Sequence, residues 1–121
     1  TMTEPRSVRR VISEKAANTI TAMMVNAVEN GVARKAGVPN YYIAGKTGTA
    51  QTYKHGKPLT GPGTPIASFV GFAPIDDPKF VVLVKIDRPR SSIWADATAA
   101  PLFSEIGEFL FKYYNIPPEK K

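Results

Sequence analysis

Two apolar runs joined by a short turn constrain the fold more than any other feature of this sequence. Residues 66–73 and 79–87 are both dominated by apolar side chains, and the segment 74–78 (Pro-Ile-Asp-Asp-Pro) separates them. A short turn of this composition between two such runs predicts a β-hairpin, and hence an antiparallel pair of strands. The second run is apolar at nearly every position, which predicts a central strand buried on both faces.

Helical periodicity predicts a helix on either side of the strands. Ser13 suits the N-cap of a first helix over 13–30. A second helix is expected over 98–114 with Thr98 as its cap, because Pro101 is tolerated only in a first turn. Apolar residues at three- and four-residue spacing predict the buried faces: Ala16, Ile20, Met23, Met24, Ala27 and Val28 in the first helix, and Leu102, Phe103, Ile106, Phe109, Leu110 and Tyr113 in the second.

A third strand is expected over 41–51, where two tyrosines and an isoleucine lead into the sequence Gly-Lys-Thr-Gly-Thr-Ala-Gln at 45–51. The polar, Gly- and Pro-rich stretch 52–65 then predicts a surface loop. The predicted order is helix, strand, strand, strand, helix, which indicates an α+β fold with helices flanking an antiparallel sheet. A chain of 121 residues with 43% apolar content is typical of one small globular domain.

Composition excludes several kinds of site. The chain has no cysteine, so disulfides, cysteine-ligated zinc and a cysteine nucleophile are excluded. His55 is the single histidine, which argues against a histidine-based metal site or a Ser-His-Asp triad within the chain; we expect it to be an exposed loop residue. We expect Trp94 to pack under a loop, and we expect no cofactor, no metal and no nucleic-acid partner. The net charge of +6 is scattered, although a basic module for cell-wall polymer or nucleic acid remains an alternative.

The segment Lys46-Thr47-Gly48-Thr49 carries the most specific chemical signal. Alternation along a strand places Thr47 and Thr49 on one side and Lys46 and Gly48 on the other. Two hydroxyls can together hold a carboxylate, and a neighbouring ammonium strengthens that capture. Gly48 has no side chain, so another backbone or a ligand can approach it closely. If the strand lies at a sheet edge, its unpaired N–H groups can bind an extended peptide, and one of them can serve in an oxyanion hole.

The run Ile43–Gln51 resembles the third active-site motif, Lys-Thr-Gly, of the class B penicillin-binding proteins. The resemblance extends to Ala67–Pro74, Val81–Val84 and Ala99–Phe103, and covers roughly residues 10–118. It implies the serine β-lactamase and transpeptidase fold, in which a five-stranded antiparallel sheet flanked by helices lies beside a helical subdomain. This chain would then supply three of those strands and be an incomplete copy of the fold.

The resemblance also implies a function. The family's enzymes are peptidoglycan D,D-transpeptidases, which bind D-Ala-D-Ala stem peptides, cross-link the bacterial cell wall through a serine acyl-enzyme, and are acylated by β-lactams. They act at the extracytoplasmic face of the cytoplasmic membrane, in cell division, elongation or sporulation. Transferred by position, Lys46 supports proton transfer, the Thr47 and Thr49 hydroxyls bind the substrate carboxylate, the Thr49 backbone N–H is an oxyanion donor, and Gly48 keeps the groove open.

The sequence departs from the family pattern because it contains neither Ser-x-x-Lys nor Ser-x-Asn. We therefore expect the nucleophile upstream, and we expect residues 1–121 to be the C-terminal segment of a transpeptidase domain, inactive in isolation. The strand over 79–87 would then present an open apolar edge, paired with the missing N-terminal part of the domain or with a second copy. A non-catalytic domain that senses β-lactams or stem peptides remains an alternative.

Overall fold

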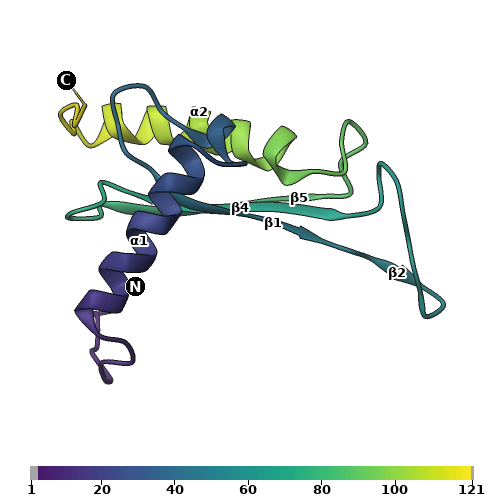
Figure 1. The fold of residues 1–121 in the computed structure, drawn as a ribbon, viewed down its shortest axis with the longest axis horizontal. Helices are drawn as coiled ribbons and strands as arrows, with labels where there is room; N and C mark the ends of the chain where they lie inside the picture. Colours follow the sequence, from purple (N-terminus) through teal and green to yellow (C-terminus); the bar gives the residue numbers. More distant parts are fainter. Residues whose placement is uncertain (1–2, 121) are drawn as a thin grey trace.

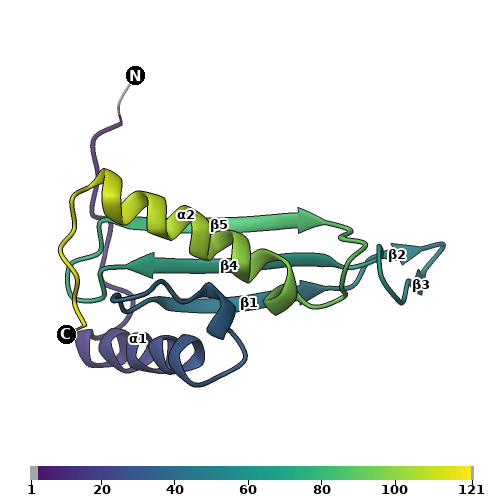
Figure 2. The ribbon, with the colours of Figure 1, turned by 90° about the horizontal axis from the view of Figure 1, so that it is seen from above.

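A three-stranded antiparallel sheet forms the centre of the molecule (Figure 1). The structure is a computed structural model and describes residues 3–120. One helix lies across a face of the sheet and another flanks its first strand (Figure 2). This arrangement confirms the predicted α+β class. The elements are α1 (Glu14–Glu29), η1 (Arg34–Ala36), β1 (Ala44–Ala50), β2 (Tyr53–Lys54), β3 (Lys57–Pro58), β4 (Ile66–Ala73), β5 (Phe80–Asp87), η2 (Ala95–Ala97) and α2 (Ala99–Tyr113).

The sheet has the strand order β1-β4-β5, with both neighbouring pairs antiparallel. The predicted hairpin is β4–β5, in which Phe69 lies opposite Val84. The prediction of a central strand buried on both faces is wrong for this chain, because among the described residues β5 pairs with β4 alone. Its side chains alternate, so Val84 is buried under α2 while Val81 and Leu83 are 70% and 67% exposed on the opposite face. No part of residues 3–120 covers that face around β5.

Helix α2 covers the other face of the sheet, and aromatic rings fill the space between them. The rings of Phe69 on β4 and Phe103 on α2 lie 4.7 Å apart, and both side chains are fully buried. The predicted face of α2 is only partly correct, since Phe103 is buried but Leu102, Phe109 and Tyr113 are exposed. The buried positions fall on one face of the helix and include small side chains that allow close approach to the sheet: Ala99, Ala100, Phe103, Gly107 and Phe111.

Helix α1 begins as predicted at Ser13, whose Oγ accepts a hydrogen bond from the Ala16 N–H at 3.1 Å. The predicted buried face is only partly correct, because Val28 is buried and Ala16, Met24 and Ala27 are half-buried, whereas Ile20 and Met23 are exposed. The N-terminal half of the helix projects beyond the sheet (Figure 1). Ile20 in this half therefore remains half exposed within the described part of the chain.

The long loop expected over 52–65 contains a small two-stranded ribbon, β2–β3, which projects from the far end of the sheet (Figure 1). His55 and Gly56 form its turn, with φ of 52° and 75°. Two consecutive positive φ values are typical of the type I′ turn that suits a two-residue hairpin. His55 is exposed there, as expected, and has a structural role in the turn.

Candidate active site

The Lys46–Thr49 segment lies on β1, which pairs with β4 on one side and, among residues 3–120, with no strand on the other. Thr47 and Thr49 are opposite Phe69 and Ala67, both buried beneath α2. Lys46 therefore points to the opposite face of the sheet, as strand alternation predicts. Because β1 is an edge strand, its polar side chains remain accessible along one border of the sheet, with Lys46 and Thr49 exposed.

Two glycines allow β1 to pack against β4. A Cβ on Gly45 would lie 2.2 Å from Cζ of the buried Phe69 ring, so this position tolerates no side chain without repacking the core. A Cβ on Gly48 would lie 2.6 Å from Ser68 Oγ, which is a small group that can rotate away. Gly48 therefore has a packing reason of its own beside the role expected for it in the groove.

A cavity of about 490 Å³ opens beside β1. Lys46, Thr47 and Thr49 line it from the strand, and Trp94, Ala95 and Asp96 line it from the segment before α2. A second cavity of about 310 Å³ shares Thr49 and Trp94 and continues beneath the loop that carries the β2–β3 ribbon. The two cavities adjoin at Thr49 and Trp94, and we call the pair the strand groove.

Hydrogen bonding holds the Lys46 ammonium close to the strand. Its Nζ donates to the Thr47 carbonyl at 2.9 Å and lies 3.5 Å from Thr47 Oγ1. The ion pairs found among the described residues involve other lysines, Lys79, Lys112 and Lys120. The Lys46 charge is therefore not neutralised by a carboxylate of the described chain, and it makes this part of the groove suited to an anion or a nucleophilic hydroxyl.

Trp94 is the residue of the groove that sequence reasoning missed. It was expected to pack under a loop, yet its side chain is 61% exposed and forms a wall shared by both cavities. Thr98 Oγ1 donates to the Trp94 carbonyl at 3.0 Å, and the Trp94 N–H donates to Ser92 Oγ at 3.1 Å. The predicted cap Thr98 thus makes no side-chain capping bond to α2 and instead holds the segment that presents the indole. The one sequence signal for an exposed Trp94 was its position as a lone aromatic residue in a polar loop before a helix.

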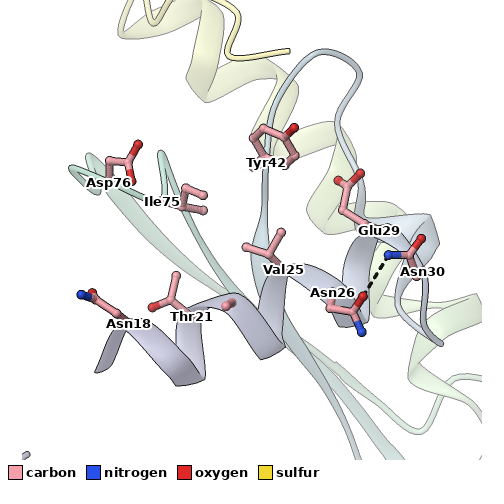
Figure 3. Close-up of a pocket in the computed structure, with 10 residues that line it drawn as sticks. Asn18, Thr21, Val25, Asn26, Glu29, Asn30, Tyr42, Ile75 and Asp76 are labelled. Atoms are coloured by element: carbon pink, nitrogen blue, oxygen red, sulfur yellow. Dashed lines mark hydrogen bonds between the residues drawn. The ribbon is translucent and has the colours of Figure 1, made fainter. Parts of the chain in front are cut away.

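A different cavity, of about 480 Å³, lies away from β1 between α1 and the β4–β5 turn (Figure 3). Its lining includes polar side chains, with the amides and hydroxyl of Asn18, Thr21 and Asn26 on α1 and the carboxylate of Asp76 on the turn. None of the expected site residues lines it. Within residues 3–120 no cluster of acidic or histidine side chains suits a metal ion, and no helix is long and apolar enough to cross a membrane.

The sequence of this chain is similar to a known protein family and to several of its members. Residues 1–108 match the model of the penicillin binding protein transpeptidase domain. The chain is 39% identical over 117 residues to stage V sporulation protein D of Bacillus subtilis, covering 96% of this chain and 18% of that protein. It is 33% identical to the peptidoglycan D,D-transpeptidase FtsI of Buchnera aphidicola, covering 92% of this chain and 19% of that protein. The chain thus spans about a fifth of the length of these relatives.

Solved structures agree with the sequence comparison. The transpeptidase domain of penicillin-binding protein 3 from Burkholderia pseudomallei superposes with a TM-score of 0.86 at 31% identity, over 98% of this chain and 36% of that one. Penicillin-binding protein 3 of Mycobacterium tuberculosis, complexed with ampicillin, gives 0.81 at 33% identity, over 99% of this chain and 29% of that one. The fold and the sequence point to one conclusion: the chain belongs to the penicillin-binding protein transpeptidase domain family.

Proposed function

We propose that this chain is the C-terminal segment of the transpeptidase domain of a peptidoglycan D,D-transpeptidase, and that it contributes half of the active site. The single observation that carries the proposal is the placement of Lys46, Thr47 and Thr49 together on an edge strand along an open groove. Family membership supports the reaction class, and the relatives include proteins named as peptidoglycan D,D-transpeptidases.

We use the term parent protein for the longer protein proposed to contain this chain. The reaction proposed for the parent protein is acyl transfer. A serine hydroxyl, supplied by sequence outside this chain, adds to the carbonyl carbon of the D-Ala-D-Ala bond. The C–N bond breaks, the terminal D-Ala leaves as an amine that has taken up a proton, and a serine ester remains. An amine of a neighbouring stem peptide then attacks the ester, which forms the cross-link and returns the proton to the serine oxygen.

Each residue of the strand has a role that follows from its position. The Thr47 and Thr49 hydroxyls bind the terminal carboxylate of the substrate, since both line the groove on one side of the strand. The Lys46 ammonium supports proton transfer at the serine, because it is exposed and has no carboxylate partner among residues 3–120. The Thr49 backbone N–H stabilises the oxyanion, and Gly48 keeps the strand open to the ligand.

β-Lactams are the second ligand class that we propose for this groove. Solved relatives of similar fold have been crystallised with ampicillin and with aztreonam. A β-lactam carries a carboxylate beside a reactive carbonyl, and these two groups match the hydroxyl pair and the oxyanion donor assigned to β1. Trp94 offers an exposed indole face to the apolar substituents of either ligand.

The uncovered face of β5 and its free edge indicate that a further part of the protein packs against this side of the sheet. Val81 and Leu83 would be desolvated if further strands and helices of the same domain, or of a second copy, packed against this side. We propose that the remainder of the transpeptidase domain covers this surface and brings the serine to the groove. The proposed substrate places the parent protein at the extracytoplasmic face of the bacterial cytoplasmic membrane.

Covalent labelling with fluorescent penicillin tests the proposal. The parent protein should retain the label through denaturing electrophoresis, whereas residues 1–121 alone should not label. A parent that binds penicillin reversibly without an adduct would favour a sensor domain. A parent that does neither, but binds DNA with a steep dependence on salt, would overturn the proposed function in favour of a basic interaction module.

A further inference from the structure

The C-terminal segment Ile116–Lys120, which we call the tail, folds back over the molecule. Asn115, just beyond the C-cap Tyr114 of α2, has a φ of 52°. The Asn115 N–H donates to the Lys112 carbonyl at 3.1 Å and the Ile116 N–H to the Phe111 carbonyl at 3.0 Å. These paired bonds form a Schellman motif, which reverses the chain after a helix. In Figure 2 the tail turns at the end of α2 and runs back toward α1. The reversal brings the tail to the segment that leads into β1.

The tail binds that segment, residues 40–42, through both backbone and side-chain groups. The N–H groups of Glu119 and Lys120 both donate to the Asn40 carbonyl at 3.0 Å. In return, the Tyr42 N–H donates to Glu119 Oε2 at 3.0 Å. The Tyr41 hydroxyl donates to the Ile116 carbonyl at 2.7 Å, and its ring stacks on Phe111 at 3.6 Å. Every residue of 40–42 is therefore held by the tail.

Lys120 also joins this segment to the end of α1. Its Nζ donates to both carboxylate oxygens of Glu29, at 2.6 and 2.7 Å, with each side chain only 30% exposed. The same ammonium lies 4.7 Å from the centroid of the Tyr42 ring. Figure 3 shows Glu29 and Tyr42 as neighbours on one side of the cavity beside α1. A partly buried cation with two carboxylate bonds and an aromatic face is restrained more strongly than an exposed ion pair.

We propose that the tail is a strap that positions β1 for acylation, with Glu119 and Lys120 as positioning residues; this rests on the proposed function. The family model matches residues 1–108 and so does not extend to the tail. Strand β1 has a strand partner on one side only among the described residues, and Ala44 follows closely on the strapped segment. Helix α1 flanks the other side of β1, and the Lys120–Glu29 ion pair joins the tail to the end of that helix. The tail therefore helps to fix the entry of β1, and a small displacement of Lys46 and Thr49 lowers the rate of a reaction that requires aligned groups.

The test compares variants of the parent protein by two measurements. One is the second-order rate constant of acylation by fluorescent penicillin at 25 °C, and the other is hydrogen exchange of peptides that cover residues 40–46. The combined variant Glu119→Ala, Lys120→Ala should react about tenfold more slowly and exchange faster in this segment while remaining folded. Lys120→Arg should keep the rate within about twofold, since it retains the cation and its partners.

Lys112→Ala is the matched control, because Lys112 forms an exposed ion pair with Glu108 on α2 and should change neither measurement. Unchanged exchange over 40–46 in the combined variant overturns the strap, as does an unchanged acylation rate with only a lower melting temperature. If the combined variant fails to fold, Lys120→Met, which removes the cation and keeps Glu119, is measured in its place and should shift both measurements in the same direction. If the unsubstituted protein is not acylated at all, the proposed function is wrong. Hydrogen exchange over residues 40–46 then decides whether the tail restrains this segment.

Discussion

Gly45 lets β1 approach the core, and replacing it with alanine should destabilise the domain strongly. The new Cβ would lie 2.2 Å from Cζ and 2.9 Å from Cε1 of Phe69, a ring that is fully buried and packed against Phe103. The buried Phe69 and Phe103 rings are packed together, so the clash has to be relieved by shifts of both β1 and the Phe69 ring. Overpacking of this kind costs roughly 1–3 kcal/mol, and the short distance places Gly45→Ala at about 3 kcal/mol.

Gly48→Ala is the matched control on the same strand. Its Cβ would meet Ser68 Oγ at 2.6 Å, and rotation of that hydroxyl relieves the contact, so we expect a loss of about 1 kcal/mol or less. The assay measures the free energy of unfolding of the parent transpeptidase domain by urea denaturation, with tryptophan fluorescence as the signal. Phe69→Leu should recover part of the loss when added to Gly45→Ala, because it removes the ring edge. Equal unfolding free energies for Gly45→Ala and the unsubstituted protein would refute the packing argument.

Three further predictions concern the groove and the open face. Thr49→Val removes a hydroxyl from the groove and should lower the acylation rate by about tenfold or more, whereas Thr19→Val on α1 should not; equal rates would contradict the carboxylate role. Trp94→Ala should change the unfolding free energy by less than about 0.5 kcal/mol, since the side chain is 61% exposed, yet weaken binding of β-lactams with apolar substituents in competition assays; a large loss of stability would indicate packing instead. Residues 1–121 alone should self-associate in sedimentation experiments, and Val81→Thr with Leu83→Thr should reduce this; a monodisperse unsubstituted monomer would contradict an adhesive open face.

Local patterns predicted the elements of the fold because each has its own signal. The turn between the two apolar runs corresponds to the β4–β5 hairpin, and Ser13 and Thr98 stand at the N-caps of α1 and α2. Strand alternation also placed Thr47 and Thr49 together, opposite in direction to Lys46. These features depend on residues close in sequence, and the predicted spans differ from the observed bounds mainly where Tyr41–Ile43 precede β1 instead of belonging to it.

Burial was harder to predict, because it depends on what covers each face. Ile20, Leu83 and Phe109 are apolar residues in the right periodicity, but the sheet and helices of the described chain leave each of them at least 50% exposed. Trp94 was missed for a related reason, since an exposed indole beside a groove has the same local sequence as a buried one. The tail contacts had no signal at all, because Glu119 and Lys120 meet partners 77 and 91 positions earlier in the sequence.

Identification of the acylated residue tests the central claim most directly. The parent protein is treated with penicillin and digested, and the adduct is located by mass spectrometry in the unsubstituted protein and in Lys46→Ala. We predict an adduct on a serine outside residues 1–121, formed at least about a hundredfold more slowly without the Lys46 ammonium. An adduct on a residue of this chain, or an acylation rate unaffected by Lys46→Ala, would contradict the assignment of β1 as the half of the active site that assists a serine from elsewhere in the protein.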